Sequence, residues 1–263
     1  MKRNLKCFAL AMGAALVMPL AANAQDNLEV HGKADFVSDY IWRGFDQNQG
    51  FAVQPTLSLG YKGFMLGFWG STPVSNFAEK TTPKEFDINL CYMNKGLCLM
   101  VTDYWWGGKK QPYGYYEKNG VDGNVDGGHH FEGTVSYNFG EKFPLTLSWS
   151  TWFAGADALK ISDLENGDSK RCFSTYINAS YNFSLPADIT LTPSIGFTPW
   201  EGYYSHSASN EDNYDKAAVT DISLKASKDV KVNDNFSIPV FVQATVAPVV
   251  DQTYLVAGFS LGF

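Results

Sequence analysis

The chain has 263 residues, of which 45% are hydrophobic and 18% are charged, and its formal net charge at pH 7 is −7. An acidic balance without a basic stripe excludes a nucleic-acid partner as the main function. The length suits one domain, because neither a Pro/Ser-rich linker nor a repeat of about 20 to 50 residues divides it.

The first segment has the three parts of a secretory signal peptide. Lys2, Arg3 and Lys6 form a positive region, residues 8–20 are apolar, and residues 22–24 (Ala-Asn-Ala) form a small-residue cleavage site. The apolar run is short for a membrane-spanning helix, and no comparable run follows it. We therefore expect residues 1–24 to be a cleaved leader and residues 25–263 to be the exported domain.

Beyond the leader, apolar and polar residues alternate one by one in about twelve segments, which predicts strands with two different faces. Eight of the segments have 9 to 11 residues, about the length that a tilted membrane-spanning strand needs, and the other four alternate over five to seven residues. In chain order the segments cover residues 28–36, 51–61, 64–68, 86–92, 97–101, 131–139, 145–153, 173–183, 189–197, 222–226, 236–246 and 255–263.

The connections between these segments are alternately short and long. The short ones are residues 62–63, 94–96, 140–144, 184–188 and 229–235, and the long ones are 72–83, 107–128, 155–171 and 200–216. This rhythm predicts an all-β fold, a closed up-and-down antiparallel transmembrane β-barrel of about twelve strands, with tight turns and both termini on the periplasmic side of the bacterial outer membrane. Residues 44–50 form a shorter outward connection, which leaves the limits of the first hairpin open.

Alternation alone also fits a soluble sandwich or a lipocalin-like barrel, so the direction of the two faces rests on other features. Two groups of aromatic residues, one at each end of the strands, are typical of girdles at the two membrane interfaces. Near the short turns these are Tyr61, Phe64, Tyr92, Tyr137, Phe139, Tyr181, Phe183 and Phe236; near the long loops they are Trp42, Trp69, Trp105, Trp106, Trp152 and Trp200.

The last strand alternates up to Phe263, and this ending is similar to the signal that the bacterial barrel-assembly machinery reads. That machinery, outer-membrane lipid and lipopolysaccharide are therefore the expected partners, besides small solutes. Three prolines fit the strand pattern poorly, because Pro55, Pro193 and Pro239 each remove a backbone donor inside a predicted strand, so we expect bulges or different strand limits there. Asp103 falls on the lipid-facing register unless a bulge intervenes.

Residues 35–44 (Asp-Phe-Val-Ser-Asp-Tyr-Ile-Trp-Arg-Gly), followed by Gln54 and Gly60-Tyr61, resemble the opening motif of the TorF-type porin family of exported bacterial proteins. The specific likeness covers only the start of the predicted barrel, and the rest resembles that family in strand rhythm. The resemblance implies an outer-membrane barrel with porin function and adds little about the substrate.

A barrel of about twelve strands lies between eight-stranded barrels, which side chains fill, and 16-stranded porins with an aqueous channel. The inward register supplies pore-lining candidates of both charge signs: Glu29, His31, Lys33, Asp35, Arg43, Glu85, Asp87, Glu132, Asp221 and Lys225. These residues form either a polar constriction that selects small solutes or a salt-bridged network that fills a structural barrel, in which Arg43 pairs with Asp39 or Asp35. For any single residue we expect the network, and for the protein as a whole we expect a passive channel with no cofactor and at most a mild preference for cations.

Two other functions stay open. One is a closed barrel whose Tyr- and Gly-rich loops bind a partner at the cell surface. The other is a lipid-modifying enzyme, which needs a Ser/His pair facing the bilayer. His129 and His130 border a loop and His206-Ser207 lies inside one, but no supporting acid is in register, so no catalytic triad and no enzymatic activity are expected.

One string is similar to the start of a calcium loop. Asp122, Asn124 and Asp126 have the right spacing, but Gly133 occupies the position of the usual twelfth-place carboxylate and Glu132 lies one place early. A flexible acidic loop is the better interpretation, so no metal site is expected.

Cys91 and Cys98 flank the turn at residues 94–96 on the same inward face. If Met93 pairs with Gly96, the two cysteines lie directly opposite each other near disulfide distance, and the oxidising periplasm permits a bridge. A register two residues away pairs Cys91 with Met100 instead. Cys172 is then a lone buried thiol.

Overall fold

The computed structural model describes residues 28–47, 50–75, 82–107, 128–161, 170–206, 216–234 and 236–262. The predicted leader, the acidic loop with Asp122, Asn124 and Asp126, and Phe263 lie outside these ranges. The strands of the wall are β1 (Glu29–Val37), β4 (Ala52–Tyr61), β5 (Phe64–Pro73), β6 (Lys84–Asn94), β7 (Leu97–Gly107), β8 (His129–Asn138), β9 (Leu145–Gly155), β10 (Thr175–Tyr181), β11 (Phe183–Leu185), β12 (Ile189–Thr198), β13 (Ala218–Asn233), β14 (Phe236–Ala247) and β15 (Gln252–Gly262).

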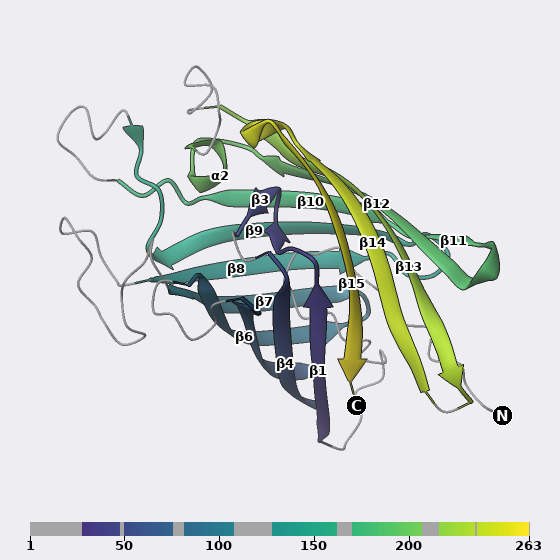
Figure 1. Ribbon diagram of the computed structural model, residues 1–263. Helices are drawn as coiled ribbons and strands as arrows, with labels where there is room; N and C mark the ends of the chain where they lie inside the picture. The colour runs from purple at the N-terminus through teal and green to yellow at the C-terminus, as the bar shows by residue number, and fades with distance from the viewer. Residues whose placement is uncertain are drawn as a thin grey trace.

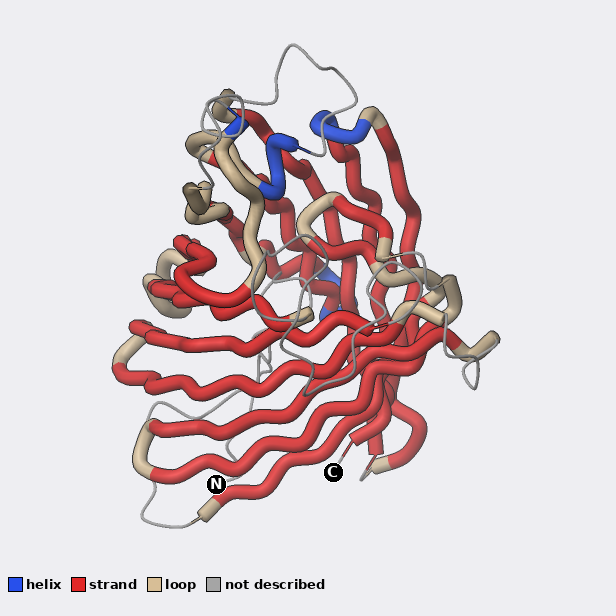
Figure 2. Tube along the Cα trace, turned by 90° about the vertical axis from the view of Figure 1, so that its left-hand side faces the viewer, coloured by secondary structure: helices blue, strands red, loops and turns tan. Residues whose placement is uncertain are grey.

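These strands form one closed antiparallel barrel. Each strand pairs with its neighbours in the sequence, and β1 pairs with β15, so the first and last strands lie side by side (Figure 1). β11 continues β10 after a break at Asn182, which makes twelve strands in the wall. Figure 2 shows them as one continuous sheet that curves around a lumen. The predicted all-β up-and-down barrel is therefore confirmed.

The sequence encodes the tight turns through Lys-Gly pairs. Lys62 and Gly63 have φ of 49° and 86°, and Lys95 and Gly96 have φ of 48° and 90°. Two consecutive positive φ values are the geometry of two-residue hairpins whose twist matches that of the strands. A Cβ at Gly96 would lie 2.3 Å from the carbonyl oxygen of Asn138, so this turn also needs glycine for space.

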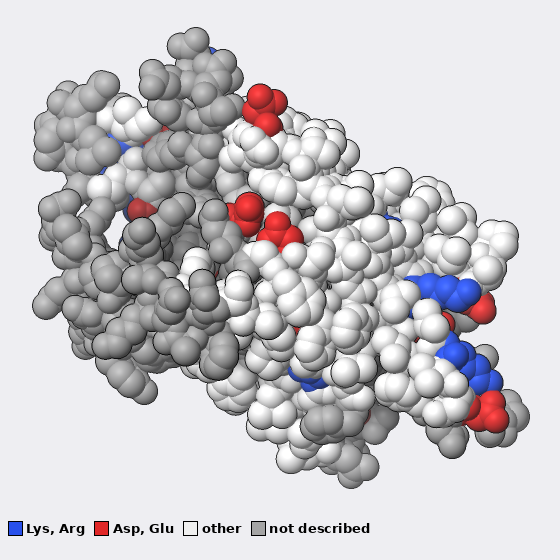
Figure 3. All heavy atoms as spheres, viewed as in Figure 1, with Lys and Arg blue, Asp and Glu red and all other residues white. Residues whose placement is uncertain are grey.

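The polarity of the wall is the reverse of that in a soluble barrel. Leu57, Leu90 and Leu255 are exposed on the outside, whereas Asn89 and Thr102 are buried inside. Over β13–β15 the described surface is almost free of charge between the charged groups at its two ends (Figure 3). Among the described residues, no helix has the length and apolarity needed to cross a membrane.

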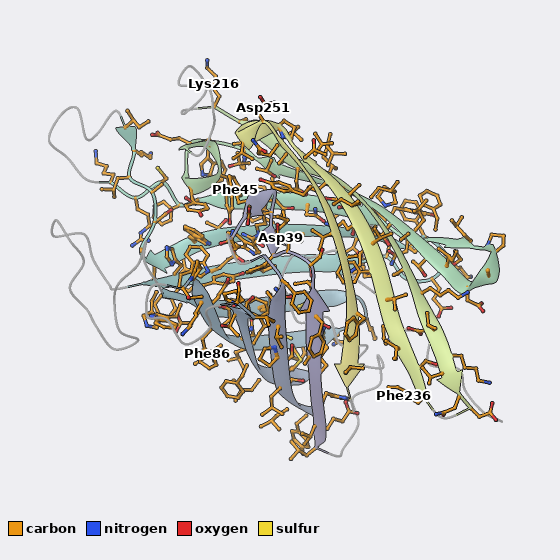
Figure 4. All side chains as sticks on the ribbon, in the orientation of Figure 1. Asp39, Phe45, Phe86, Lys216, Phe236 and Asp251 are labelled. Atoms are coloured by element: carbon orange, nitrogen blue, oxygen red, sulfur yellow. The ribbon has the colours of Figure 1, made fainter. Side chains whose placement is uncertain are left out.

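We call the end of the barrel with the tight turns the turn end and the opposite end the loop end; Phe236 lies at the first, Lys216 and Asp251 at the second (Figure 4). At the turn end, the predicted aromatic residues lie outside the barrel, with Phe64 at 56% exposure. At the loop end the prediction was wrong for four tryptophans, because Trp42, Trp69, Trp106 and Trp152 lie in an aromatic cluster inside the barrel. Trp69, Trp106 and Trp152 occupy inward positions of β5, β7 and β9, and Trp42 lies on a segment that leaves the wall.

The three prolines sit where the ladder is already interrupted. The pairing of β4 with β5 skips Gln54 and Pro55, and Pro193 faces the break between β10 and β11. Pro239 lies beyond the last pair of β14 with β15. At each proline, the missing N–H therefore faces a position where the neighbouring strand is not paired. This corrects the expectation of bulges or different strand limits. Asp103 stays on the outward register without a bulge in β7 and pairs with His129 at 2.8 Å.

Candidate functional site

The site is built around a short hairpin that enters the barrel at its loop end. After β1 the chain forms β2 (Ile41–Trp42) and β3 (Phe45–Asp46) before it returns to the wall as β4. Arg43 and Gly44 make the two-residue turn, with φ of 52° and 88°. A Cβ at Gly44 would lie 2.7 Å from the carbonyl oxygen of Thr220 on β13, so the hairpin crosses the lumen and touches the wall. We call residues 41–46 the plug hairpin; Figure 4 shows Phe45 within the barrel.

Aromatic side chains fill the space between the plug hairpin and the wall. The Trp42 ring lies 5.7 Å from Tyr104, 5.5 Å from Trp106 and 6.4 Å from Trp152, measured between ring centroids. A second inserted segment, α2 (Tyr203–His206), places Tyr204 5.9 Å from Trp42. The buried members of this aromatic plug are Tyr40, Trp42, Phe45, Trp69, Tyr104, Trp152, Tyr176, Tyr204 and Val249. The loop end of the lumen is therefore packed.

Arg43 joins the plug hairpin to the opposite wall. Its guanidinium donates to both carboxylate oxygens of Glu132 on β8, with Nη1–Oε2 of 2.6 Å and Nη2–Oε1 of 2.8 Å, and also to the Tyr204 hydroxyl. The same group lies 4.5 Å from the Trp42 ring centroid and 4.6 Å from that of Tyr176. Burial alone would lower the pKa of Arg43, but the Glu132 carboxylate raises it well above its ordinary value. Arg43 is thus a charged, bidentate clamp.

The partner of Arg43 differs from the one that we predicted. Neither Asp39 nor Asp35 holds it, because the plug hairpin carries Arg43 away from β1 and across the lumen to Glu132. Glu132 accepts a further hydrogen bond from the Tyr104 hydroxyl at 2.9 Å, and its side chain is fully buried.

Three other predicted carboxyl groups lie at the loop end of the lumen. Asp221 on β13 accepts hydrogen bonds from Tyr176 at 3.0 Å and from Thr220 at 2.9 Å. Glu85 and Asp87 on β6 are buried next to each other, close to Tyr40 and Trp106. Glu85 Oε1 and both Asp87 oxygens accept no well-formed hydrogen bond from the described residues. This part of the lumen therefore holds four carboxyl groups around one arginine.

The other predicted lumen residues lie closer to the turn end and are more accessible. Lys33 and Asp35 on β1 form an ion pair of 2.6 Å, and His31 lies 3.6 Å from Glu29. Lys225 on β13 places its ammonium 4.4 Å from the ring centroid of Phe241. The inward face thus carries every predicted pore-lining residue of the wall, but it divides them into two groups along the barrel axis.

Between these groups the wall presents mainly hydroxyl and amide side chains that bond one another. Thr102 donates to Asn89 at 2.8 Å, and Thr134 and Ser150 lie 2.8 Å apart. The buried members of this polar belt are Gln54, Thr56, Ser58, Asn89, Thr102, Thr134, Ser136, Thr146, Ser148, Ser150, Asn178, Ser180, Thr192, Ser194, Ser223 and Thr245.

Sequence reasoning missed the tyrosines that complete the site. Tyr104 and Tyr176 occupy inward positions of β7 and β10, so strand alternation contained the signal for both. Tyr204 comes from a long connection with no strand pattern, and nothing in the sequence indicated that it enters the lumen.

Of the two registers that the sequence left open around the turn at residues 95–96, the structure has the one that pairs Cys91 with Met100. Asn94 pairs with Leu97, so Cys91 faces Met100, and Cys98 faces Met93. Cys91 and Cys98 are diagonal neighbours, Cys172 is buried elsewhere, and none of the three cysteines forms a disulfide.

The histidines take two different positions. His129 faces outward with its acidic partner Asp103, whereas His130 is buried inside, with its ring centroid 4.3 Å from Trp106 and 4.6 Å from Trp152. Ser207, which follows His206, lies outside the described residues. Thr102 and Thr134 carry hydroxyl groups near the two histidines. Both residues face inward, whereas His129 faces outward.

Residues 21–250 match the family described as "Bacterial protein of unknown function (Gcw_chp)". The chain belongs to this family. No curated protein matches the Gcw_chp chain.

Solved structures that are similar to the Gcw_chp chain include a KdgM porin, at 10% identity and a TM-score of 0.45, and a NanC porin, at 8% identity and a TM-score of 0.49. Both alignments cover 89% of this chain and 99% of the other. A COG4313 outer membrane channel from Pseudomonas putida F1 is 16% identical, with a TM-score of 0.43, and the alignment covers 94% of this chain and 100% of that channel. Likeness at these levels carries no information about what the Gcw_chp chain binds or transports.

Proposed function

We propose that the chain is a porin-like channel of the bacterial outer membrane through which small hydrophilic solutes diffuse passively. The function that the TorF-type resemblance implies, and export through a leader at residues 1–24, are parts of the same proposal. The observation that carries it is the reversed polarity of the wall: apolar side chains such as Leu90 and Leu224 are outside, and the polar belt is inside.

Each face supports one half of this proposal. An apolar outer surface suits lipid, in which the closed barrel satisfies the backbone groups of every strand. A lumen lined by hydroxyl and amide groups suits water and polar solutes.

The aromatic plug closes the described part of the proposed path at its loop end. Solutes would pass when the plug hairpin shifts from its contacts with Tyr104 and Trp152, and the Arg43–Glu132 clamp controls this shift. Glu85, Asp87 and Asp221 add carboxyl groups around the same point, and the channel is proposed to favour cations mildly.

The decisive test is single-channel conductance of the refolded chain in a planar bilayer. Discrete steps are expected, and their cation selectivity should fall in the variant Glu85→Gln plus Asp87→Asn. Glu141→Gln, an exposed change in the turn between β8 and β9, is the matched control and should leave selectivity unchanged. A folded barrel that shows no conductance at positive or at negative voltage would contradict the proposed channel function.

The packed aromatic plug favours one second candidate, a closed barrel that binds a partner at its loop end. The two candidates separate in a variant in which Gly-Ser replaces residues 41–46. A channel gains conductance when the plug hairpin is removed, and the wild-type chain also conducts. A closed binding barrel conducts only in that variant.

A further inference from the structure

Five sulfur-containing side chains meet on the inner face of β5, β6 and β7. Met65, Cys91 and Met100 form a buried cluster, with exposures of 2%, 2% and 8%, and Met93 and Cys98 pack against them. The strand register places Met65 opposite Cys91, Cys91 opposite Met100, and Met93 opposite Cys98. Cys91 and Cys98 are diagonal neighbours across the pair of β6 and β7. We call these five residues the sulfur cluster.

The composition of the chain makes this grouping specific. Its six methionines are Met1, Met12 and Met18 in the predicted leader, and Met65, Met93 and Met100. Every methionine beyond the leader therefore belongs to the sulfur cluster, together with two of the three cysteines beyond it. The next inward positions along the wall carry Thr134 and Ser136, so the cluster is a sulfur patch beside the polar belt.

The chemistry of these groups selects one kind of ligand. Thiolate and thioether sulfurs are soft donors that prefer Cu(I) and similar cations, whereas Mg²⁺ and Ca²⁺ prefer oxygen. Thioethers are soft donors that bind Zn(II) poorly, so a set of thiolates and thioethers favours a soft ion such as Cu(I). Each thiol that ligates the ion forms an S–metal bond and releases its proton to water.

The position of the cluster gives it a route to solvent. Met93 and Cys98 lie one residue inside the strand ends that flank the Lys95-Gly96 turn, and both are half-buried. Met65, Cys91 and Met100 lie deeper. An ion that arrives at the turn end of the lumen therefore meets one thiol and one thioether first, and the buried sulfurs next.

We propose that the sulfur cluster is a binding site for a soft monovalent cation of the Cu(I) class, reached from the turn end of the lumen. Cys91 and Cys98 are the anionic ligands, and Met65, Met93 and Met100 supply the thioethers. The site does not depend on the proposed channel activity, because it lies away from the plug hairpin and needs access from one end only.

The test is anaerobic titration of the reduced, refolded full domain with Cu(I) in competition with a chromophoric Cu(I) chelator. One Cu(I) per chain should leave the chelator, and X-ray absorption should show a shell of sulfur neighbours. Ag(I), which needs no reductant, should compete for the same site, and excess Zn(II) should not. The double variant Cys91→Ser plus Cys98→Ser should weaken binding by more than about 100-fold, because it removes two ligands, and loss of a group that only supports a ligand already costs roughly 10–100-fold.

Two further variants keep the result decisive. Cys172→Ser removes a buried thiol elsewhere and should leave binding unchanged. Met65→Leu plus Met93→Leu plus Met100→Leu conserves the volume of the core and should lower the number of sulfur neighbours and the affinity, even if the cysteine variant fails to fold. Absence of Cu(I) binding by the wild-type chain, or equal binding by the cysteine variant, would overturn the proposal. A Cys91–Cys98 disulfide in the chain isolated from cells without reductant would also overturn it, because a disulfide provides no thiolate.

Discussion

The two halves of the lumen are built from the same alternating wall and have different contents. At the loop end, residues far apart in the chain meet: Arg43 contacts Glu132, 89 positions away, and Tyr204, 161 positions away. At the turn end, contacts run between adjacent strands or along one strand, as in the sulfur cluster and the Lys33–Asp35 pair. The loop end thus depends on inserted segments, and the turn end on the wall alone. Changes at the loop end should consequently cost more stability and alter the path through the barrel more.

The largest effect should follow from Glu132→Ala. This change leaves the Arg43 guanidinium buried without its carboxylate, and breaking one side of a buried ion pair costs about 3–5 kcal/mol of the free energy of unfolding. Urea unfolding of the refolded barrel in detergent measures it, with the exposed change Glu141→Gln as the control. The additional change Arg43→Met should restore part of the loss, because it removes the unpaired charge. Equal stability of Glu132→Ala and wild type would show that the clamp does not hold the plug hairpin.

Trp42→Ala should come next. The Trp42 side chain is 1% exposed among Tyr104, Trp106 and Trp152, and truncating a buried Trp costs about 3 kcal/mol or more, because the cavity cannot collapse around rigid rings. Trp200→Ala is the matched control at the same end, since Trp200 is 39% exposed on the outside. Thermal unfolding, followed by near-UV circular dichroism, compares the two. Similar losses in both variants would contradict the division between plug and outer surface.

Nearly all of the wall could be predicted from the sequence, but little of the site at the loop end. Residues in strands alternate with a period of two, so the inward positions of Glu85, Asp87 and Asp221 could be read directly from the sequence. The turn at Lys95-Gly96 was also visible, but its register was not, because a shift of two residues conserves both faces of each strand. That is why the sequence allowed Cys91 to face either Cys98 or Met100.

The inserted segments left no comparable signal. Trp42 follows a strand-like segment, and a tryptophan close to a long loop fits a membrane girdle as well as a plug. Only the positive φ at Arg43 and Gly44 turns this segment into a separate hairpin, and Arg-Gly is not by itself a strong turn sequence. Contacts such as Arg43–Glu132 depend on closure of the whole barrel, which no local pattern encodes.

A substitution in a tight turn at the turn end should lower the free energy of unfolding by less, and the loss should depend on the room for the added Cβ. Gly96→Ala brings a Cβ to 2.3 Å from the Asn138 carbonyl oxygen and places alanine at φ of 90°. Gly140→Ala has nearly the same φ, 89°, with nothing within 4 Å of the added Cβ. The backbone strain that both share is about 1 kcal/mol, and Gly96→Ala should lose about 1–2 kcal/mol more. Urea unfolding of both variants isolates the steric part of the loss in the free energy of unfolding. Equal losses in the two variants would show that the hairpin moves and relieves the clash.

The smallest effect on stability should come from Lys33→Gln. The Lys33 side chain is 33% exposed, and the pair that it forms with Asp35 is accessible to solvent, so its loss should change the free energy of unfolding by only about 0.5 kcal/mol. For ion selectivity, the charge of Lys33 matters more than its pair with Asp35. Lys33 and Lys225 are neighbouring cations that offset carboxyl groups of the lumen. Removing one of them should raise cation selectivity in bilayer recordings, whereas Lys231→Gln, an exposed change near the end of β13, should not. The two halves would then differ in what they control. The loop end would control the closure of the lumen, and the turn end would control its charge.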